Sequence, residues 1–216
     1  MMTTSASASA SGSGSGSPAG HLFDTLPEQD APALERLRER LSAQAQREGV
    51  LDVAYRTLAT PAGDLLLAAT EQGLVKVAFA VQDHDRVLQQ LAGAISPRVL
   101  SSPKRLDETS RQIEEYFAGE RTRFELTLDW RLSKGFRREV LAHLQDIGYG
   151  RTESYAQVAA ASGRPRAVRA VGTACATNPL PVVVPCHRVV RSDGSAGGYA
   201  GGADAKRVLL SLETAA

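Results

Sequence analysis

The segment 180–185, with the sequence LPVVVP, is the feature that most limits how this chain can fold. Its β-branched residues and its two prolines leave little side-chain and backbone freedom, so we expect it to be stiff and buried. Cys186, His187 and Arg188 follow it directly. The sequence therefore predicts that a cysteine beside two ionisable groups is held by a rigid, buried stretch of chain.

Cys186 is a candidate nucleophile. The thiolate is the reactive form of cysteine, and a nearby histidine or arginine lowers the thiol pKa or accepts its proton. His187 supplies a base and Arg188 a positive charge. Because neighbouring side chains point apart in an extended segment, we expect a bridging water to relay the proton. The alternative is that Cys186 is a small buried hydrophobic residue, as we expect of Cys175 on its apolar helical face.

Two short helices are predicted upstream of this segment. Ser154 and Gln157 match a capping box, in which both side chains bond free N–H groups at a helix start. That helix is expected to end at Gly163, and Pro165 to open a second helix that runs to about Thr177. Two short helices joined by a few residues that include glycine are typical of a helix-turn-helix.

The second of these helices has a polar face that carries Arg166, Arg169, Thr173 and Thr177, whereas Val168 follows the apolar period. Arginines near the start of a recognition helix can reach phosphates or bases of DNA. The alternative is that these side chains only solvate the outer face of the helix.

Charge is distributed unevenly along the chain. Residues 131–216 carry 12 Lys and Arg against 6 Asp and Glu, whereas residues 1–130 carry 13 against 18. A basic half is expected of a module that binds a polyanion, although an ordinary fluctuation of surface charge gives the same numbers.

Glycines surround Tyr199 downstream of the candidate nucleophile. Glycine lets the backbone approach a ligand closely, so this stretch is expected to form a pocket wall or lid, or else a plain surface loop. The chain then closes with a helix that carries Lys206 and Glu213. A carboxylate in the last turn opposes the helix dipole, so we expect Glu213 to have another task, such as orienting a histidine.

The first part of the chain predicts a small α/β unit. Amphipathic helices are expected over 32–47 and after Ser102-Pro103, and Ser133 is expected to cap a later helix that Gly148 stops. Short β-type runs separated by turn residues predict strands over 53–58, 64–70, 74–79 and 123–128.

Composition predicts four parts of the chain and excludes several classes of protein. The parts are a disordered Ser/Ala/Gly tail over 1–20, an extension with a helix over 21–50, an α/β domain over 51–130 and a mostly helical domain over 131–216. No stretch approaches the roughly 20 apolar residues of a membrane span, and the N-terminus lacks the pattern of a secretory signal. Two cysteines without a CxxC pair argue against a disulfide framework and a zinc site. We therefore expect a cytoplasmic protein without a metal.

Several motifs in the second half together resemble the O6-alkylguanine-DNA alkyltransferase family, the methylated-DNA–protein-cysteine methyltransferases. They are Tyr155, the run 166–172, Asn178-Pro179, the PCHRV run 185–189 and the GYAGG run 198–202. The resemblance is clear from about Phe136 to Glu213 and looser over 53–128. It implies an α+β fold, with a small RNase H-like α/β domain followed by a mostly helical helix-turn-helix domain of winged-helix-like type.

The resemblance also implies roles in alkyl transfer. Cys186 would accept the alkyl group of O6-alkylguanine, and also of O4-alkylthymine, in a reaction that consumes the protein. His187 would act through water as its base, oriented by Glu213. Asn178 would brace the turn before the active-site segment. Tyr155 would help to rotate the nucleotide and would donate a proton to the leaving guanine.

The remaining implied roles concern binding. Tyr199, Ala200 and Val189 would bind the substrate, with Lys206 supporting the local charges. Double-stranded DNA would contact Arg166, Arg169 and Thr173, and Arg169 would fill the space of the flipped base. The resemblance implies no cofactor and no metal, and we expect a monomer.

Two residues depart from the pattern of the family. Leu141 stands where many relatives have Trp, and Ala200 stands where some have a Ser that can bond the guanine oxygen. The second departure leaves the rate and the tolerated alkyl size open. The alternative function is a lesion-binding or regulatory helix-turn-helix protein without transfer activity, which the pairing of Cys186 and His187 with Glu213 disfavours.

Overall fold

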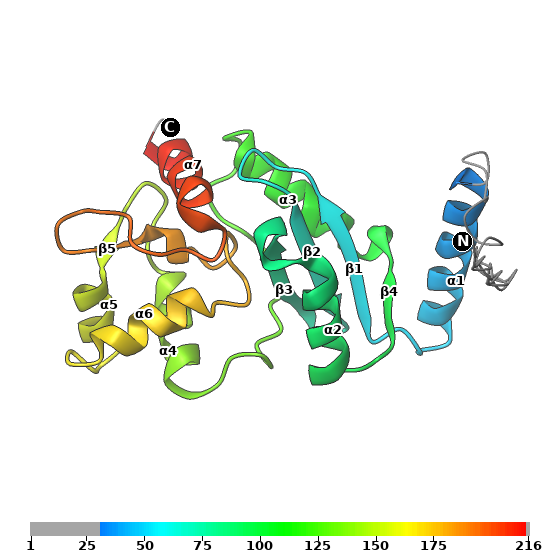
Figure 1. Cartoon of the computed structure of the whole chain (residues 1–216), viewed down its shortest axis with the longest axis horizontal. Helices are drawn as coiled ribbons and strands as arrows, with labels where there is room; N and C mark the ends of the chain where they lie inside the picture. The colour runs from blue at the N-terminus through cyan, green and yellow to red at the C-terminus, as the bar shows by residue number, and fades with distance from the viewer. Residues whose placement is uncertain (1–30, 215–216) are drawn as a thin grey trace, which may run out of the picture. The chain divides into compact units, whose positions relative to one another are not determined.

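The computed structural model describes residues 31–214 (Figure 1). The chain divides after Leu37 into two units, inside helix α1 (Ala31–Arg47), and the second unit carries all the features described below. Helix α1 confirms the helix predicted over 32–47. The predicted Ser/Ala/Gly tail over 1–20 lies outside the described residues.

A four-stranded sheet forms the centre of the first domain. Strands β1 (Val53–Leu58), β2 (Leu65–Thr70) and β3 (Gly73–Phe79) follow the sequence prediction closely and pair as two antiparallel hairpins. A short strand, β4 (Val99–Ser101), adds a parallel edge beside β1, so the strand order is β3-β2-β1-β4.

Both faces of the sheet are covered, which explains why β2 is apolar from Leu65 to Ala69. Leu66 and Ala68 of β2 pack with the core that includes Val87 of α2 (His84–Ala94). Leu65 and Leu67 face the other way, into the core shared with α3 (Asp107–Phe117) and with the second domain. Side chains alternate across a strand, so a strand buried on both faces has no polar positions.

The second domain is mostly helical (Figure 1). It contains α4 (Gly135–Leu144), α5 (Tyr155–Ala161), α6 (Val168–Ala176) and α7 (Gly202–Thr214), with a small parallel pair of strands, β5 (Glu153–Ser154) and β6 (Val189–Val190). Helices α5 and α6 are the helix-turn-helix pair that the sequence predicts. Together with the sheet domain they confirm the predicted α+β fold. None of the helices in the described part of the chain has the length and apolar character to cross a membrane.

The predicted capping box at the start of α5 is confirmed. Ser154 Oγ accepts a hydrogen bond from Gln157 N at 3.2 Å, and Gln157 Oε1 accepts one from Ser154 N at 2.7 Å. Two other helix starts were predicted wrongly. Pro165 lies in a turn closed by Ala167 N donating to Arg164 O, so α6 begins only at Val168. Ser133 does not cap α4, since Lys134 is the residue that precedes its first turn.

The strand predicted over 123–128 is also wrong. This segment meets the edge of β3 at a single bridge, where Leu74 N donates to Thr127 O and Asp129 N donates to Leu74 O. Earlier in the segment, at Glu125, the side chain of Gln112 in α3 makes the backbone hydrogen bonds that a neighbouring strand would make. This side chain donates to Glu125 O and accepts from Glu125 N. The alternating pattern is real, but one side chain and a single bridge replace the ladder of hydrogen bonds that a strand would form.

Candidate active site

The segment that leads to Cys186 is fixed by one buried side chain, Asn178. Its Oδ1 accepts a hydrogen bond from Leu180 N at 2.9 Å, and its Nδ2 donates to Val184 O at 2.9 Å. The same Nδ2 lies 3.1 Å from Cys186 Sγ. Every residue from 178 to 190 is buried, which confirms that the segment 180–185 is buried. Asn178 therefore joins both ends of the segment to the sulfur atom.

Cys186, His187 and Arg188 form a 3₁₀ turn, and this corrects the extended geometry expected from the sequence. Arg188 N donates to Pro185 O at 3.0 Å, which closes the turn. Cys186 is 2% exposed and His187 is fully buried. No hydrogen bond joins the two side chains within the described residues, in agreement with the expectation that they do not touch directly.

The carboxylate of Glu213 lies behind His187. His187 Nε2 is 2.9 Å from Glu213 Oε1, and Arg188 reaches both carboxylate oxygens, with Nε 2.9 Å from Oε2 and Nη2 2.8 Å from Oε1. Glu213 therefore contacts a histidine, as its expected task of orienting one requires. The Nδ1 atom of His187 is buried and has no hydrogen-bond partner among the described residues.

Burial sets the resting protonation states. Burial raises the pKa of the Cys186 thiol to about 11, although the Asn178 hydrogen bond and the Lys206 charge oppose the shift. Burial also lowers the pKa of His187 below its usual value, against the opposing effect of Glu213. Both groups are therefore neutral near pH 7, and the imidazole is free to act as a base.

Glu213 remains ionised in spite of its burial. Burial alone would raise its pKa, but hydrogen bonds from His187, Arg188 and Tyr116 lower it to about 2. An ionised carboxylate only accepts hydrogen bonds, so the proton between it and His187 belongs to Nε2. In the neutral ring Nδ1 then carries the lone pair.

The residues predicted to bind the substrate surround this centre. Tyr199 is half-buried, with its ring edge-on to those of His187 and Phe79 at centroid distances of 6.3 and 5.5 Å. Its hydroxyl oxygen is buried without a hydrogen-bond partner among the described residues. Lys206 is buried and donates from Nζ to Val189 O at 2.6 Å.

Glycines bring this loop close to Tyr155 and Phe79. A Cβ on Gly197, where φ is +64°, would lie 2.9 Å from the hydroxyl of Tyr155. A Cβ on Gly201 would lie 2.8 Å from the ring of Phe79. Tyr155 is half-buried at the start of α5, and burial and the nearby thiols raise its pKa. Ala200 is half-buried between these two close approaches.

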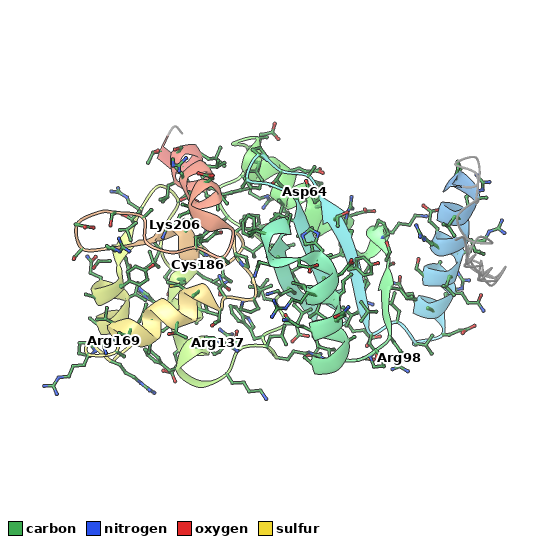
Figure 2. All side chains as sticks on the ribbon, viewed as in Figure 1. Asp64, Arg98, Arg137, Arg169, Cys186 and Lys206 are labelled. Carbon is green, nitrogen blue, oxygen red and sulfur yellow. The ribbon has the colours of Figure 1, made fainter. Side chains whose placement is uncertain are left out.

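The predicted DNA-binding residues lie apart from the sulfur atom. Arg166, Arg169 and Thr173 are all exposed, along the turn before α6 and the helix itself. Figure 2 shows Arg169 at the outer edge of the helical domain, whereas Cys186 is inside it. Val168 is 38% exposed, so it lies on this outer face and not on the apolar face that its period predicts.

Two site residues escaped the sequence analysis, and both come from the first domain. Tyr116 of α3 donates a hydrogen bond to Glu213 Oε1 at 2.6 Å, across 97 residues of sequence. Phe79, at the end of β3, packs against Tyr199. Neither lies in a motif that carries chemistry, and no local pattern connects them to Cys186.

Two protein-family models match the chain. The ribonuclease-like domain of 6-O-methylguanine DNA methyltransferase matches residues 53–130, and the DNA binding domain matches residues 135–215. A methylated-DNA–protein-cysteine methyltransferase of Mycolicibacterium paratuberculosis is 40% identical over 161 residues, which are 74% of this chain and 92% of the relative. A constitutive methyltransferase of the same description from Bacillus subtilis is 39% identical over 165 residues, covering 74% and 94%.

Solved structures agree with the sequence relatives. The crystal structure of a Mycobacterium tuberculosis O6-methylguanine methyltransferase superimposes with a TM-score of 0.67 at 37% identity, over 76% of this chain and 93% of that one. A structure of Mycobacterium tuberculosis OGT in complex with DNA gives a TM-score of 0.66 at 36% identity, over 75% and 93%.

Proposed function

The chain belongs to the 6-O-methylguanine DNA methyltransferase family, and we propose that it repairs DNA by moving the alkyl group of an O6-alkylguanine onto Cys186. One observation carries the proposal. The buried thiol follows a segment clamped by Asn178, and the next residue, His187, is a neutral base whose Nε2 is held by an ionised Glu213.

The high pKa of the thiol decides how the reaction starts. With a pKa of about 11, only about one Cys186 in ten thousand is a thiolate at pH 7, so the proton must be removed within the site. His187 Nδ1 accepts this proton through a water molecule, and Glu213 stabilises the resulting imidazolium. The ion pair then offsets the cost of the buried thiolate.

The transfer itself is an in-line displacement. The Cys186 sulfur forms a bond to the alkyl carbon as the bond from that carbon to guanine O6 breaks. Tyr155, whose raised pKa keeps it protonated, donates a proton to the leaving guanine, and the proton that His187 took from the thiol replaces it through water. The product is a thioether, which has no leaving route from the buried site, so each protein molecule acts once.

DNA is proposed to bind along the exposed face of α6. Arg166, Arg169 and Thr173 are free to meet the phosphates, which provide affinity that does not depend on sequence. The O6 carbon is hidden inside a duplex, so the damaged base must be flipped out, at a cost of a few kcal/mol. Arg169 takes the place of the flipped base, and Tyr199 forms one wall of its pocket. The monomeric state and the cytoplasmic location stay predictions.

Labelled DNA provides the test. Duplex DNA carrying an isotopically labelled O6-methylguanine is incubated with the protein, and peptides are analysed by mass spectrometry. We expect one methyl group per protein molecule, on Cys186. Cys186→Ala should bind the DNA and accept no methyl group, whereas Cys175→Ala, which changes the other buried thiol, should still accept one.

Two outcomes would reject the proposal. If Cys186 gains no methyl group while the DNA stays bound, the protein is a lesion-binding or regulatory module without transfer activity. If one protein molecule demethylates many bases, Cys186 is not the final acceptor. The same assay with O4-methylthymine tests the second substrate that the family resemblance implies.

A further inference from the structure

The carboxylate of Glu213 is shared between the two domains. From the second domain, His187 and Arg188 bond to it, and Gly150 N lies 3.3 Å from Oε2. From the first domain, the Tyr116 hydroxyl donates to Oε1 at 2.6 Å, the same oxygen that His187 contacts at 2.9 Å. Tyr116 and His187 therefore compete for the negative charge of one oxygen atom.

Tyr116 is held rigidly in this position. It is completely buried on α3, and its ring contacts those of Phe117, Phe124 and Tyr149 at centroid distances of 5.4, 5.2 and 6.0 Å. Burial and the charge of Glu213 raise the pKa of its hydroxyl far above the ordinary value. The hydroxyl is thus always protonated, and with the ring packed on several sides its donor direction is fixed.

We propose that Tyr116 is a positioning residue that takes up part of the charge on Glu213 and so keeps His187 neutral, ready to accept a proton. Arg188 contacts both carboxylate oxygens and already holds the carboxylate in place. On Oε1, beside His187 Nε2 and Arg188 Nη2, Tyr116 adds a third donor, and its contact of 2.6 Å is the shortest of the three. Without it, more of the negative charge of Oε1 would face His187, and the imidazole would bind a proton more tightly.

The other groups that face His187 do not replace the effect of Tyr116 on the charge of Glu213. The charges of Lys206 and Arg188 oppose a positive charge on the ring. Lys206 is hydrogen-bonded to Val189 O and Arg188 to Glu213. The hydroxyl of Tyr199 has no hydrogen bond to the His187 ring within the described residues, although the two rings form a T-shaped pair. The first domain would thereby set the pH range in which the second domain reacts, a role that rests on the proposed function.

The test compares two tyrosines of the same aromatic cluster. Tyr116→Phe removes the hydroxyl on Glu213 and keeps the ring. Tyr149→Phe is the matched control, because it removes a neighbouring hydroxyl that donates to Leu212 O at 3.3 Å. Single-turnover methyl transfer is measured from pH 4.5 to 8.5 at saturating DNA, at a temperature where melting curves show all three proteins to be folded.

For Tyr116→Phe we expect the acid limb of the profile to move to higher pH by about half a unit to one unit, which lowers the rate on that limb about three- to tenfold. At pH 8.5 its rate should be no lower than that of the unchanged protein, because a more basic His187 also takes the proton of Cys186 more readily. The rate of Tyr149→Phe should equal that of the unchanged protein at every pH. The proposal is overturned if the pH profile of Tyr116→Phe does not move. It is also overturned if the rate falls equally at every pH, because that result means that Tyr116 has a purely structural role.

A second measurement does not depend on transfer. Nitrogen NMR of His187, identified among the four histidines by a His187→Asn variant, follows its protonation directly. The midpoint should rise in Tyr116→Phe and stay in place in Tyr149→Phe; an unchanged midpoint overturns the inference. If the unchanged protein gains no methyl group but the midpoint rises, the proposed function fails while the effect of Tyr116 on His187 holds.

Discussion

Asn178→Ala tests whether one side chain holds the active-site segment. The substitution removes the bonds to Leu180 N, Val184 O and Cys186 Sγ. Leu180 is fully buried, so its N–H loses its partner where water cannot replace it, whereas Val184 O keeps a hydrogen bond from Cys186 N at 2.8 Å. An orphaned buried group costs about 1–3 kcal/mol, so we expect a loss of roughly 2 kcal/mol in the free energy of unfolding. For a chain of this size that corresponds to a fall in Tm of roughly 4–8 °C.

Thermal unfolding followed by circular dichroism measures this effect, and Thr177→Ala is the control. Thr177 is the exposed neighbour of Asn178, and its hydroxyl bonds only to a carbonyl of its own helix end, Thr173 O at 2.8 Å. We expect the control to change the stability by less than about 0.5 kcal/mol. Methyl transfer by Asn178→Ala should also be slower below its melting range, because the sulfur loses a hydrogen bond that favours the thiolate. If the two variants melt together, Asn178 does not clamp the segment and the reasoning fails.

Two further substitutions test the loop and the buried carboxylate. Gly201→Ala places a methyl group 2.8 Å from the Phe79 ring, so we expect the free energy of unfolding to fall by about 1–3 kcal/mol and methyl transfer to slow. Gly198→Ala, with open space around its Cβ, is the control and should change neither the stability nor the rate. Equal effects of the two variants would contradict the close approach of Gly201 to Phe79. Glu213 has a pKa of about 2, below its ordinary value of 4.5, so its contribution of roughly 3 kcal/mol is complete above pH 4.5 and is lost as the pH falls towards 2. Urea unfolding measures the free energy of unfolding at pH 7 and at pH 3. Its decrease between the two pH values should be smaller for Glu213→Gln than for the unchanged protein. An equal decrease would mean that other carboxylates cause the loss of stability in acid.

The features that the sequence predicts well depend on residues close together in the chain. The capping box of α5 needs only Ser154 and Gln157, and both expected hydrogen bonds are present. The burial of the segment 180–185 follows from its own composition. Glu213 is a partial exception, because its unfavourable position at a helix end indicated a buried partner, and that partner is His187.

The features that the sequence does not predict depend on contacts between distant parts. The segment 123–128 alternates like a strand, but whether a ladder forms depends on the edge of β3, which offers it a single bridge. The turn at Cys186 is closed locally by Arg188 N and Pro185 O, but the Arg188 side chain that it carries bonds to Glu213, 25 residues further along the chain. Tyr116 reads as an ordinary core residue of α3, and its bond to Glu213 exists only once the two domains have packed together.

The buried thiol and the shared carboxylate together explain how one cysteine can be both protected and reactive. A thiol with a pKa of about 11 is almost never a thiolate at rest, and oxidants and electrophiles react with the thiolate. Reactivity must therefore come from the neighbours, and the ionised Glu213 makes it available by stabilising a charged His187. If Tyr116 limits that stabilisation, the resting site stays neutral until an alkyl carbon is in place. If Cys186 is the single-use acceptor that we propose, such restraint prevents it from being consumed by anything other than its substrate.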